Sequence, residues 1–500
     1  MGASAVVWFK RDLRLADHAP LREAARLGDA VALYVVEPAW VGSAECEAQH
    51  LEFARRQVLA LRECLGRRGL PLLVRWGSLP EVLAGLRSAY PFTHLLSHEE
   101  TGPQWSYDRD RAVARWCREA GVIWRQWPQK GVIRGLRERA GWAARWQGRM
   151  DARIEPAPAR WRGAGGLPIG EWPDARIRQA GHGAARELPA AGEAAAHDTL
   201  ASFLDVRGQR YRFDISSPSS AVRACSRLSA HLAFGALSVR QVHQATEARI
   251  AALQAVGDAE ARSFAYHLRG FSARLRWHCH FMQKLESEPQ IEWRNVARVC
   301  DGLREQAFDR ERFDAWRTGN TGYPMVDACM RCLNATGWIN FRMRAMLVSF
   351  AAYHLWLHWR EPGLHLARQF LDFEPGIHWS QMQMQSGTTG INTLRMYSPA
   401  RQHADHDPRS EFIRRWLPEY GTAAYVRPIV DERAALHLAR QRLYTLRRTP
   451  EARREAAEVQ RRHGSRRGGL PPTRRRAGAG RVRDADPAQR ELPFDDAGRA

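Results

Sequence analysis

Lysine is nearly absent from this chain of 500 residues, which contains only Lys10, Lys130 and Lys284. The net charge is nevertheless +22, from 76 basic and 54 acidic residues, so the basic character is almost entirely arginine. Residues 446–500 hold 15 arginines and 8 acidic residues, a surplus of seven, which leaves +15 on the remainder. The codon bias of a GC-rich genome explains arginine over lysine. A basic folded body also favours a polyanionic partner such as nucleic acid.

Long apolar runs are missing too. One of the longest, Ala345 to Tyr353, is far shorter than the ~20 residues of a membrane span. Met1 to Val7 leads directly into Trp-Phe-Lys-Arg-Asp, without the apolar core of a signal peptide. We therefore expect no membrane contact and a cytoplasmic, monomeric protein.

Cysteine is scarce, with eight residues in the chain, as is usual for a reduced compartment. Cys329 and Cys332 form a Cys-x-x-Cys inside a helical pattern, and no second pair stands nearby. His278, Cys279 and His280 are consecutive, so on a helix they point in different directions and do not converge on one ion. We predict no metal site.

The first 130 residues alternate short β-branched runs with amphipathic stretches. The predicted strands are 5–9, 30–36, 72–76, 94–97 and 122–127, and the predicted helices are 51–65, 79–90 and 107–120. This alternation predicts a doubly wound, parallel, five-stranded sheet. No Gly-x-Gly-x-x-Gly follows the first strand, which argues against a dinucleotide site of the usual kind.

The rest of the chain divides into three parts. Residues 133–199 form a connecting segment whose pattern dissolves into Ala, Pro, Gly and Arg after residue 150. Residues 200–446 show helical periodicity and no convincing strand, which predicts a large all-α domain after the α/β domain of residues 1–132. Residues 447–500 are basic with few large apolar side chains, which predicts a disordered tail.

The segment Ser226-Arg227-Leu228-Ser229 leads at once into a helical pattern. Hydroxyls, an arginine and exposed N–H groups at a helix start suit a phosphate, although serine is also a common helix cap. Four further motifs follow, at residues 316–327 (WRTGNTGYPMVD), 335–344 (ATGWINFRMR), 358–361 (HWRE) and 370–392 (FLDFEPGIHWSQMQMQSGTTGIN).

The order and spacing of these motifs, with Val6 to Leu15 (VVWFKRDLRL) at the start, resemble the cryptochrome/photolyase family. The resemblance covers roughly residues 5–445. It implies an FAD bound in the helical domain, above which a flipped-out lesion in DNA enters a cavity. It also implies that the excited, reduced flavin passes an electron to a pyrimidine dimer, whose joining bonds then break.

The resemblance also implies site residues. Those matched to FAD binding are Tyr211, Ser226, Arg227, Leu228, Ser229, Phe271, Arg344, Asp372, Glu374 and His378. Those matched to lesion and DNA contact are Arg274, Trp277, Arg342 and Arg395, and Trp359 matches the middle of three tryptophans that reduce the flavin. His378 matches the position near flavin N5, where it can supply a proton or only a hydrogen bond.

Several positions depart from the family pattern. Arg274 stands where dimer-repairing enzymes usually have Glu, and Phe341 and Ala345 replace an Asn and a Met. The two histidines of enzymes that repair the 6-4 lesion are absent from the same two positions. Met382 and Gln306 occupy the outer two tryptophan positions, so Trp379, Trp356 or Trp338 would have to supply another route.

Three functions follow as hypotheses. The first is light-driven repair of pyrimidine dimers in DNA, the second is a blue-light photoreceptor that signals to a partner through the tail, and the third is a nucleic-acid-binding protein without a cofactor. The family resemblance also implies an antenna pigment in the α/β domain, near the strand end at His98 to Gly102. The sequence leaves a folate, a deazaflavin and an empty pocket as alternatives.

Overall fold

The structure is a computed structural model that describes residues 4–306, 308–465 and 468–469. The N-terminal domain contains five parallel strands, β1 (Ser4–Phe9), β2 (Asp29–Val36), β3 (Leu72–Trp76), β4 (His94–His98) and β5 (Ile123–Trp127). Their order is β3-β2-β1-β4-β5, so the chain reverses its winding direction between β1 and β4. The predicted doubly wound, five-stranded sheet is confirmed. Each strand lies within two residues of its expected bounds.

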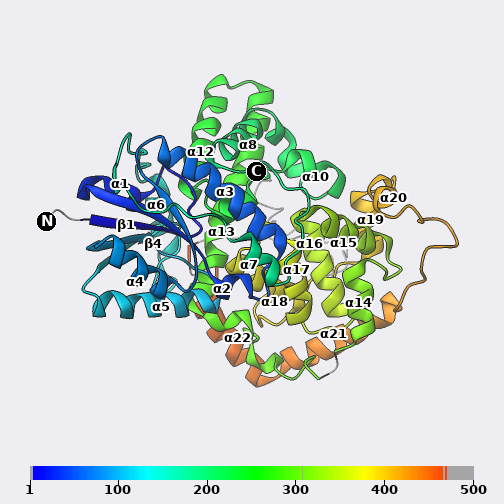
Figure 1. Ribbon diagram of the computed structural model, residues 1–500. Coiled ribbons are helices and arrows are strands. Elements are labelled where there is room, and N and C mark those ends of the chain that lie inside the picture. Colours follow the sequence, from blue (N-terminus) through cyan, green and yellow to red (C-terminus); the bar gives the residue numbers. More distant parts are fainter. Residues whose placement is uncertain (1–3, 307, 466–467, 470–500) are drawn as a thin grey trace.

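Helices cover both faces of this sheet (Figure 1). They are α1 (Ala19–Leu27), α2 (Pro38–Val41), α3 (Ala48–Gly66), α4 (Leu79–Ala89) and α5 (Gln104–Glu119). Two apolar clusters lie on opposite faces because side chains alternate along each strand: Val7 and Phe9 belong to one cluster, and Val6 and Trp8 to the other. This burial on both sides explains why β1 and β2 read as continuous apolar runs.

The connecting segment holds more regular structure than its composition suggests. It contains α6 (Trp142–Asp151), the two-residue strand β6 (Arg162–Gly163), which pairs with β2, and α7 (Asp174–Gln179). Trp142 and Trp146 are fully buried. A Cβ on Gly131 would overlap the Trp146 ring, so the chain there has no room for a side chain. Trp142, Trp146 and Met150, spaced four residues apart, form the buried face of α6 and anchor this part of the segment.

The predicted all-α domain is confirmed over the described residues. Its α-helices are α8 (Glu193–Asp205), α9 (Tyr211–Asp214), α10 (Pro218–Ala224), α11 (Ser229–Ala233), α12 (Val239–Val256), α13 (Ala259–Ser287), α14 (Arg310–Thr318), α15 (Pro324–Thr336), α16 (Phe341–Ser349), α17 (Arg360–Gln369), α18 (Pro375–Ser386), α19 (Pro399–His406), α20 (Glu411–Trp416) and α21 (Glu432–Arg448). Short 3-10 helices span Arg207–Arg210, Pro289–Glu292 and Arg298–Cys300, and a π-helix spans Phe350–His354. Helices α13 and α18 pack together at the centre of the domain.

The prediction that residues 447–500 are disordered is wrong at its start, because α22 spans Pro450–His463. Val459 is fully buried in a cluster with Leu285, Ile291 and Val296. The Glu455 carboxylate accepts hydrogen bonds from the N–H groups of Arg298 (2.5 Å) and Val299 (2.9 Å). These tertiary contacts order a helix with little apolar surface of its own. Residues 470–500 lie outside the described part of the chain.

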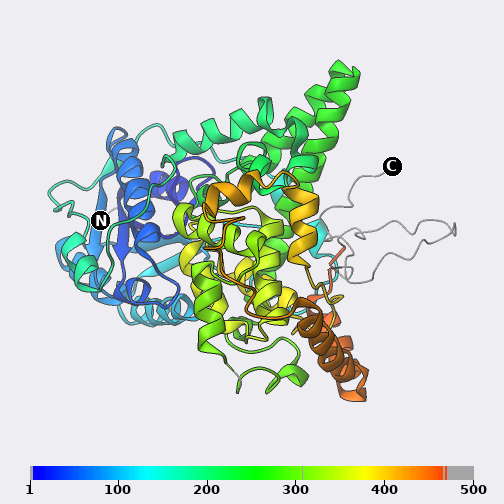
Figure 2. The same ribbon diagram turned by 90° about the vertical axis from the view of Figure 1, so that its right-hand side faces the viewer.

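The two domains stand side by side, and α21 and α22 run along the edge of the helical domain (Figures 1 and 2). No helix in the described residues is long and apolar enough to cross a membrane.

Candidate functional site

The helical domain encloses a cavity of about 310 Å³. It lies among α9, α11, α13, α16, α18 and the loops around residues 226, 338 and 372. A cavity of this size lies within the range that small-molecule ligands occupy. Twelve of the residues singled out in the sequence line it: Tyr211, Ser226, Arg227, Ser229, Phe271, Arg274, Trp277, Arg342, Arg344, Asp372, Glu374 and His378.

An ion pair between Arg344 and Asp372 forms one wall. Arg344 donates from both terminal nitrogens to the two carboxylate oxygens, at 2.9 and 3.0 Å, and its Nε donates to the carbonyl of Ile339 at 2.8 Å. Burial alone raises the pKa of Asp372, but the Arg344 guanidinium outweighs it and holds that pKa below the usual value. The pair thus places a fixed anion and a fixed cation at the cavity.

Arg227 has an unusual backbone conformation for a non-glycine residue, with φ of 60°. Its guanidinium lies 3.9 Å from the centre of the Trp338 ring. Its Nη1 is buried and has no partner among the described residues. Leu228 does not line the cavity but packs in the core next to it. The predicted phosphate loop therefore presents three of its four residues, Ser226, Arg227 and Ser229, to a ligand.

His378 is a neutral hydrogen-bond donor. Its Nε2 lies 2.9 Å from the carbonyl oxygen of Gly363, so this nitrogen carries the proton and Nδ1 is left as an acceptor. The ring is packed against Phe373 and Trp379, with centroids 5.2 and 4.7 Å away. Burial lowers the pKa of His378 to about 3, which keeps the ring uncharged at neutral pH.

Glu374 joins the cavity to the N-terminal domain. Lys130 Nζ lies 2.5 Å from its Oε2, and both side chains are nearly buried. Beside this pair, Arg11 donates to the carbonyl of Phe373 at 2.9 Å. Lys130 is not among the residues predicted from the sequence. The one signal in the sequence was its rarity as one of three lysines.

The residues that replace the usual lesion contacts also face this cavity. Arg274, Phe341 and Ala345 all line it, together with Trp277. The Arg274 guanidinium lies 5.5 Å from the Tyr211 ring, and Trp277 packs edge-on against His280 at 5.2 Å. The residues matched to the cofactor and to the lesion therefore share one continuous space.

Trp359 does not line the cavity but is linked to it through Trp379. Trp359 is buried, its Nε1 donates to Asn295 Oδ1 at 2.7 Å, and its ring lies edge-on to Trp379 with centroids 5.8 Å apart. Met382 lines the cavity three residues after Trp379, on the same side of α18, and both contact the position of Gly363. The tryptophan that contacts Trp359 is therefore Trp379. It lies one helical turn before Met382, the position at which the family pattern has a tryptophan. Arg395 does not line the cavity either.

A second crevice lies at the ends of β1 and β4, where the sheet reverses its winding and α/β proteins commonly bind ligands. We call the group Trp8, Glu37, Glu100, Trp105 and Arg109 the sheet-end crevice. The Arg109 guanidinium bonds Glu37 at 3.1 Å and Glu100 at 2.6 Å, and lies against both tryptophan rings. About 50 Å³ remains, which is less than a pigment requires.

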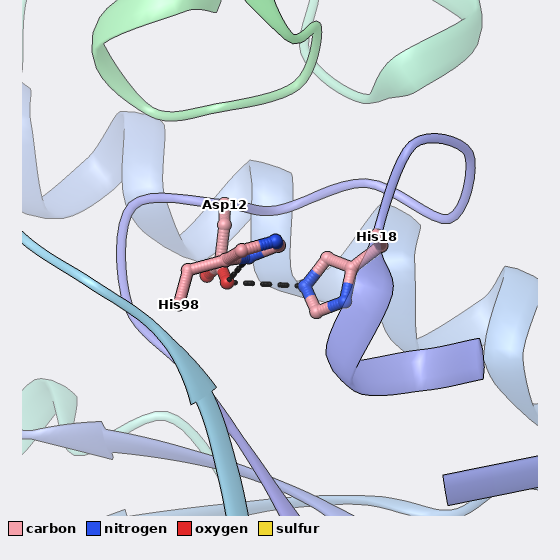
Figure 3. Close-up of side chains that lie close together, drawn as sticks. All are labelled: Asp12, His18 and His98. Atoms are coloured by element: carbon pink, nitrogen blue, oxygen red, sulfur yellow. Dashed lines mark hydrogen bonds and ion pairs between the residues drawn. The ribbon is translucent and has the colours of Figure 1, made fainter. Parts of the chain in front are cut away.

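Asp12, His18 and His98 form the one group of potential metal ligands found in the described residues (Figure 3). Asp12 Oδ2 lies 3.0 Å from His18 Nε2 and 2.7 Å from His98 Nδ1. The other nitrogen of His18 accepts a bond from the N–H of Leu21, so Nε2 must carry the proton and donates to Asp12. A protonated nitrogen cannot bind a metal, so the group acts as a hydrogen-bonded link between the loop after β1 and β4.

Together, the fold and cavity define a two-domain protein whose helical domain can enclose an extended ligand with an anionic part and an aromatic part. The family models agree: the one described as DNA photolyase matches residues 5–134, and the one described as the FAD binding domain of DNA photolyase matches residues 271–445. The chain belongs to the cryptochrome/photolyase family.

Individual relatives support this assignment. A deoxyribodipyrimidine photo-lyase of Thermus thermophilus is 30% identical over 456 residues, which cover 87% of this chain and 98% of the relative. The solved structure of a class III photolyase from Agrobacterium tumefaciens has a TM-score of 0.75 at 22% identity, over 90% of this chain and 98% of that one. A cryptochrome from Synechocystis has a TM-score of 0.74 at 21% identity, over 88% and 99%.

The residues of the main cavity fit FAD. Within the described part of the chain, several buried polar atoms of residues that line it have no hydrogen-bond partner, namely Arg227 Nη1, Asn340 Oδ1, Gln381 Nε2 and Gln385 Oε1. Because unpaired buried polar groups are costly, these atoms indicate a ligand with both donors and acceptors. Arg227 suits a phosphate, and the amides suit the edge of a heterocyclic ring.

Proposed function

We propose that this protein uses blue light to repair UV-induced pyrimidine dimers in DNA. The observation that carries the proposal is the single cavity in which the residues matched to FAD and those matched to the lesion lie together. The naming of the relatives as photo-lyases and the basic folded body are consistent with it.

When bound, FAD supplies the light absorption and the electron that opens the dimer. The chain supplies position and charge. The Arg344–Asp372 pair offers both an anion for ring N–H groups and a cation that offsets negative charge on the ring. His378 is held by Gly363 and stays neutral, so it offers a hydrogen-bond acceptor rather than a charge.

On the lesion side, we assign Trp277 as the surface on which the flipped-out bases stack. Arg274 cannot accept the thymine N–H bond that a carboxylate would accept, but it can donate to a lesion carbonyl or a phosphate. Arg342 and Arg395 are assigned to the DNA backbone. Phe341 and Ala345 replace polar or polarisable contacts with apolar ones, which makes the cavity less polar next to the lesion.

We propose further that FAD is the sole pigment of the folded body. Neither a folate nor a deazaflavin fits the sheet-end crevice while Arg109 remains bonded between the two acids. The absorbance of natively purified protein tests this assignment. Flavin bands alone are expected, and a second pigment released on denaturation would contradict it.

The first experiment compares oligonucleotides that carry a cyclobutane dimer or a 6-4 product, in single and double strands. The protein is reduced chemically, which bypasses the altered tryptophan route, and illuminated with blue light or kept dark. Light-dependent restoration of either lesion is the expected result and names the substrate. Intact lesions, with FAD bound and fully reduced, would refute repair.

A blue-light photoreceptor is the second candidate, and the substitutions at Arg274, Phe341 and Ala345 favour it. It predicts a light-dependent change in the protease sensitivity of residues 464–500. An unchanged digestion pattern in light and darkness would count against it.

A further inference from the structure

A small cavity of about 10 Å³ lies behind the main one, where α13, α18 and α22 meet. Its polar lining consists of Lys284 from α13, Ser380 from α18, His463 from α22 and Thr389. Ile291, Val296, Ile391 and Val459 complete its wall. The cavity exists only because α22 closes it, and α22 begins five residues after the matched family model ends.

Two donors at this cavity, the Lys284 ammonium group and the Ser380 hydroxyl, have no acceptor in the part of the chain that the structure describes, whereas Thr389 and His463 are bonded to Asn392 and Glu288. Within the described residues, the Lys284 ammonium group makes no hydrogen bond or ion pair, and it lies 5.1 Å from the centre of the Phe281 ring. Ser380 is 3% exposed, and its hydroxyl has no partner there either. The Ser380 hydroxyl is buried, and a buried donor in this state is expensive unless something accepts from it.

The surroundings are positive. Arg139 is 3% exposed and donates from Nη2 to the carbonyl of His280, while its Nε and Nη1 have no partner among the described residues. The nearby acid, Glu288, is already bound by His463 at 2.6 Å and Arg462 at 2.7 Å. Burial, and to a smaller extent the Arg139 guanidinium, lowers the pKa of Lys284 to about 7, and burial lowers the pKa of Arg139 to about 10.

We propose that this cavity binds one small monoatomic anion of the chloride type, with Lys284 and Ser380 as its donors. The cavity leaves about 10 Å³ for the centre of a water-sized sphere, which is room for one monoatomic ion and too little for phosphate, sulfate or a carboxylate. The positive surroundings exclude a metal cation. The aliphatic wall favours an ion that loses its hydration easily, as a halide does.

Such an anion would join Lys284 of α13 to Ser380 of α18 in a cavity that α22 closes. Ser380 lies two residues after His378, which faces the main cavity, and His463 lies at the end of α22. Occupancy would offset the repulsion between Lys284 and Arg139 and would stabilise the packing of α22. This inference does not depend on the proposed function, because its tests use neither light nor DNA.

Crystals of the full chain grown in sodium bromide provide the direct test. An anomalous difference peak between Lys284 and Ser380 is expected for the wild type and for the charge-matched control Arg461→Met, whose side chain is exposed on α22. Lys284→Met is expected to lose the peak. Absence of the peak in the wild type, or its persistence in Lys284→Met, overturns the proposal and leaves a bound water.

A solution measurement covers the case in which a variant does not crystallise. The melting temperature is compared in sodium chloride and in sodium gluconate at equal ionic strength, because gluconate is too large for the cavity. The wild type and Arg461→Met are expected to melt higher in chloride, by a margin that grows as pH falls and Lys284 becomes protonated. Lys284→Met is expected to melt equally in both salts, and equal melting of the wild type would refute chloride binding.

Discussion

The main cavity and the sheet-end crevice contain similar residues but use them in opposite ways. In the crevice, Arg109 is bonded to Glu37 and Glu100 and lies between aromatic rings, so its charge is satisfied within the protein. In the main cavity, Arg227 presents a buried nitrogen with no partner in the described residues. The comparison teaches that an arginine nitrogen left without a partner in a cavity indicates a ligand site better than the mere presence of charged and aromatic residues.

The largest effect on stability is expected from Arg109→Ala in the crevice. Its loss leaves Glu37 and Glu100 buried without their cation, which typically lowers the free energy of unfolding by about 3–5 kcal/mol. Urea denaturation measures the loss. Arg67→Ala, whose ion pair with Glu63 is exposed, serves as the control and should change stability by about 1 kcal/mol or less. A small effect of Arg109→Ala would mean that the crevice is not held by its charges.

A large effect on the cofactor is expected from Asp372→Ala in the main cavity. Arg344 would lose both of its carboxylate bonds, and the cavity would lose its fixed anion. The variant should retain much less FAD than the wild type, as measured by the flavin absorbance per protein. Asp405→Ala, at an exposed ion pair with Arg401, should retain FAD fully. Full retention by Asp372→Ala would remove the pair from the assigned cofactor contacts.

Trp277→Ala should separate the two halves of the same cavity. Loss of the stacking surface is expected to weaken binding of lesion-containing DNA by about 1–3 kcal/mol, with FAD retained. Fluorescence anisotropy measures the affinity at a fixed salt concentration. Equal loss of FAD from Trp277→Ala and Asp372→Ala would contradict the division of roles.

The substitution Trp379→Phe tests whether electrons reach FAD in the main cavity through Trp379 and Trp359. Trp379 contacts both His378 and Trp359, whereas Met382 cannot carry a hole easily. Light-driven reduction of bound FAD in the presence of a thiol should slow in Trp379→Phe and in Trp359→Phe. It should be unchanged in Trp356→Phe if Trp379 is the first donor. Reduction of FAD at the wild-type rate in Trp379→Phe would show that Trp379 is not the first electron donor, and would leave Trp356 and Trp338 as the candidates.

The smallest expected effect is on the pH dependence of the free energy of unfolding. His378 stays neutral in the folded protein because burial lowers its pKa to about 3, whereas in the unfolded chain it takes up a proton below about pH 6.5. The free energy of unfolding therefore falls by about 1.4 kcal/mol per pH unit for each such histidine as the pH drops from 6.5 to 3.

His378→Asn should remove one histidine's share of this slope, because an amide can also donate to Gly363 and does not titrate. Urea denaturation at pH 7.5, 6.5 and 5.5 measures the difference between variant and wild type. Identical slopes would show that folding does not lower the pKa of His378. His98, whose pKa burial lowers to about 3, should behave similarly in the N-terminal domain.

Much of the fold was predictable from the sequence because periodicity reports burial directly. Strands such as 72–76, buried on both faces, read as short apolar runs, and α13 reads as a long helix. The helix α22 was missed because its order depends on Val459 and Glu455 meeting residues 285–299. The buried tryptophans of α6 were missed for the same reason, since their partners are distant in the sequence.

The sequence by itself determined the family, the two kinds of domain and twelve of the residues that line the cavity, because motifs keep their spacing along a chain. Only the tertiary structure decided how the charges are used. It paired Glu374 with Lys130 across the domains, satisfied Arg109 in the crevice and placed Trp379 beside Trp359. The physical reason is that electrostatic and packing energies depend on distance in space, which separation along the chain does not fix.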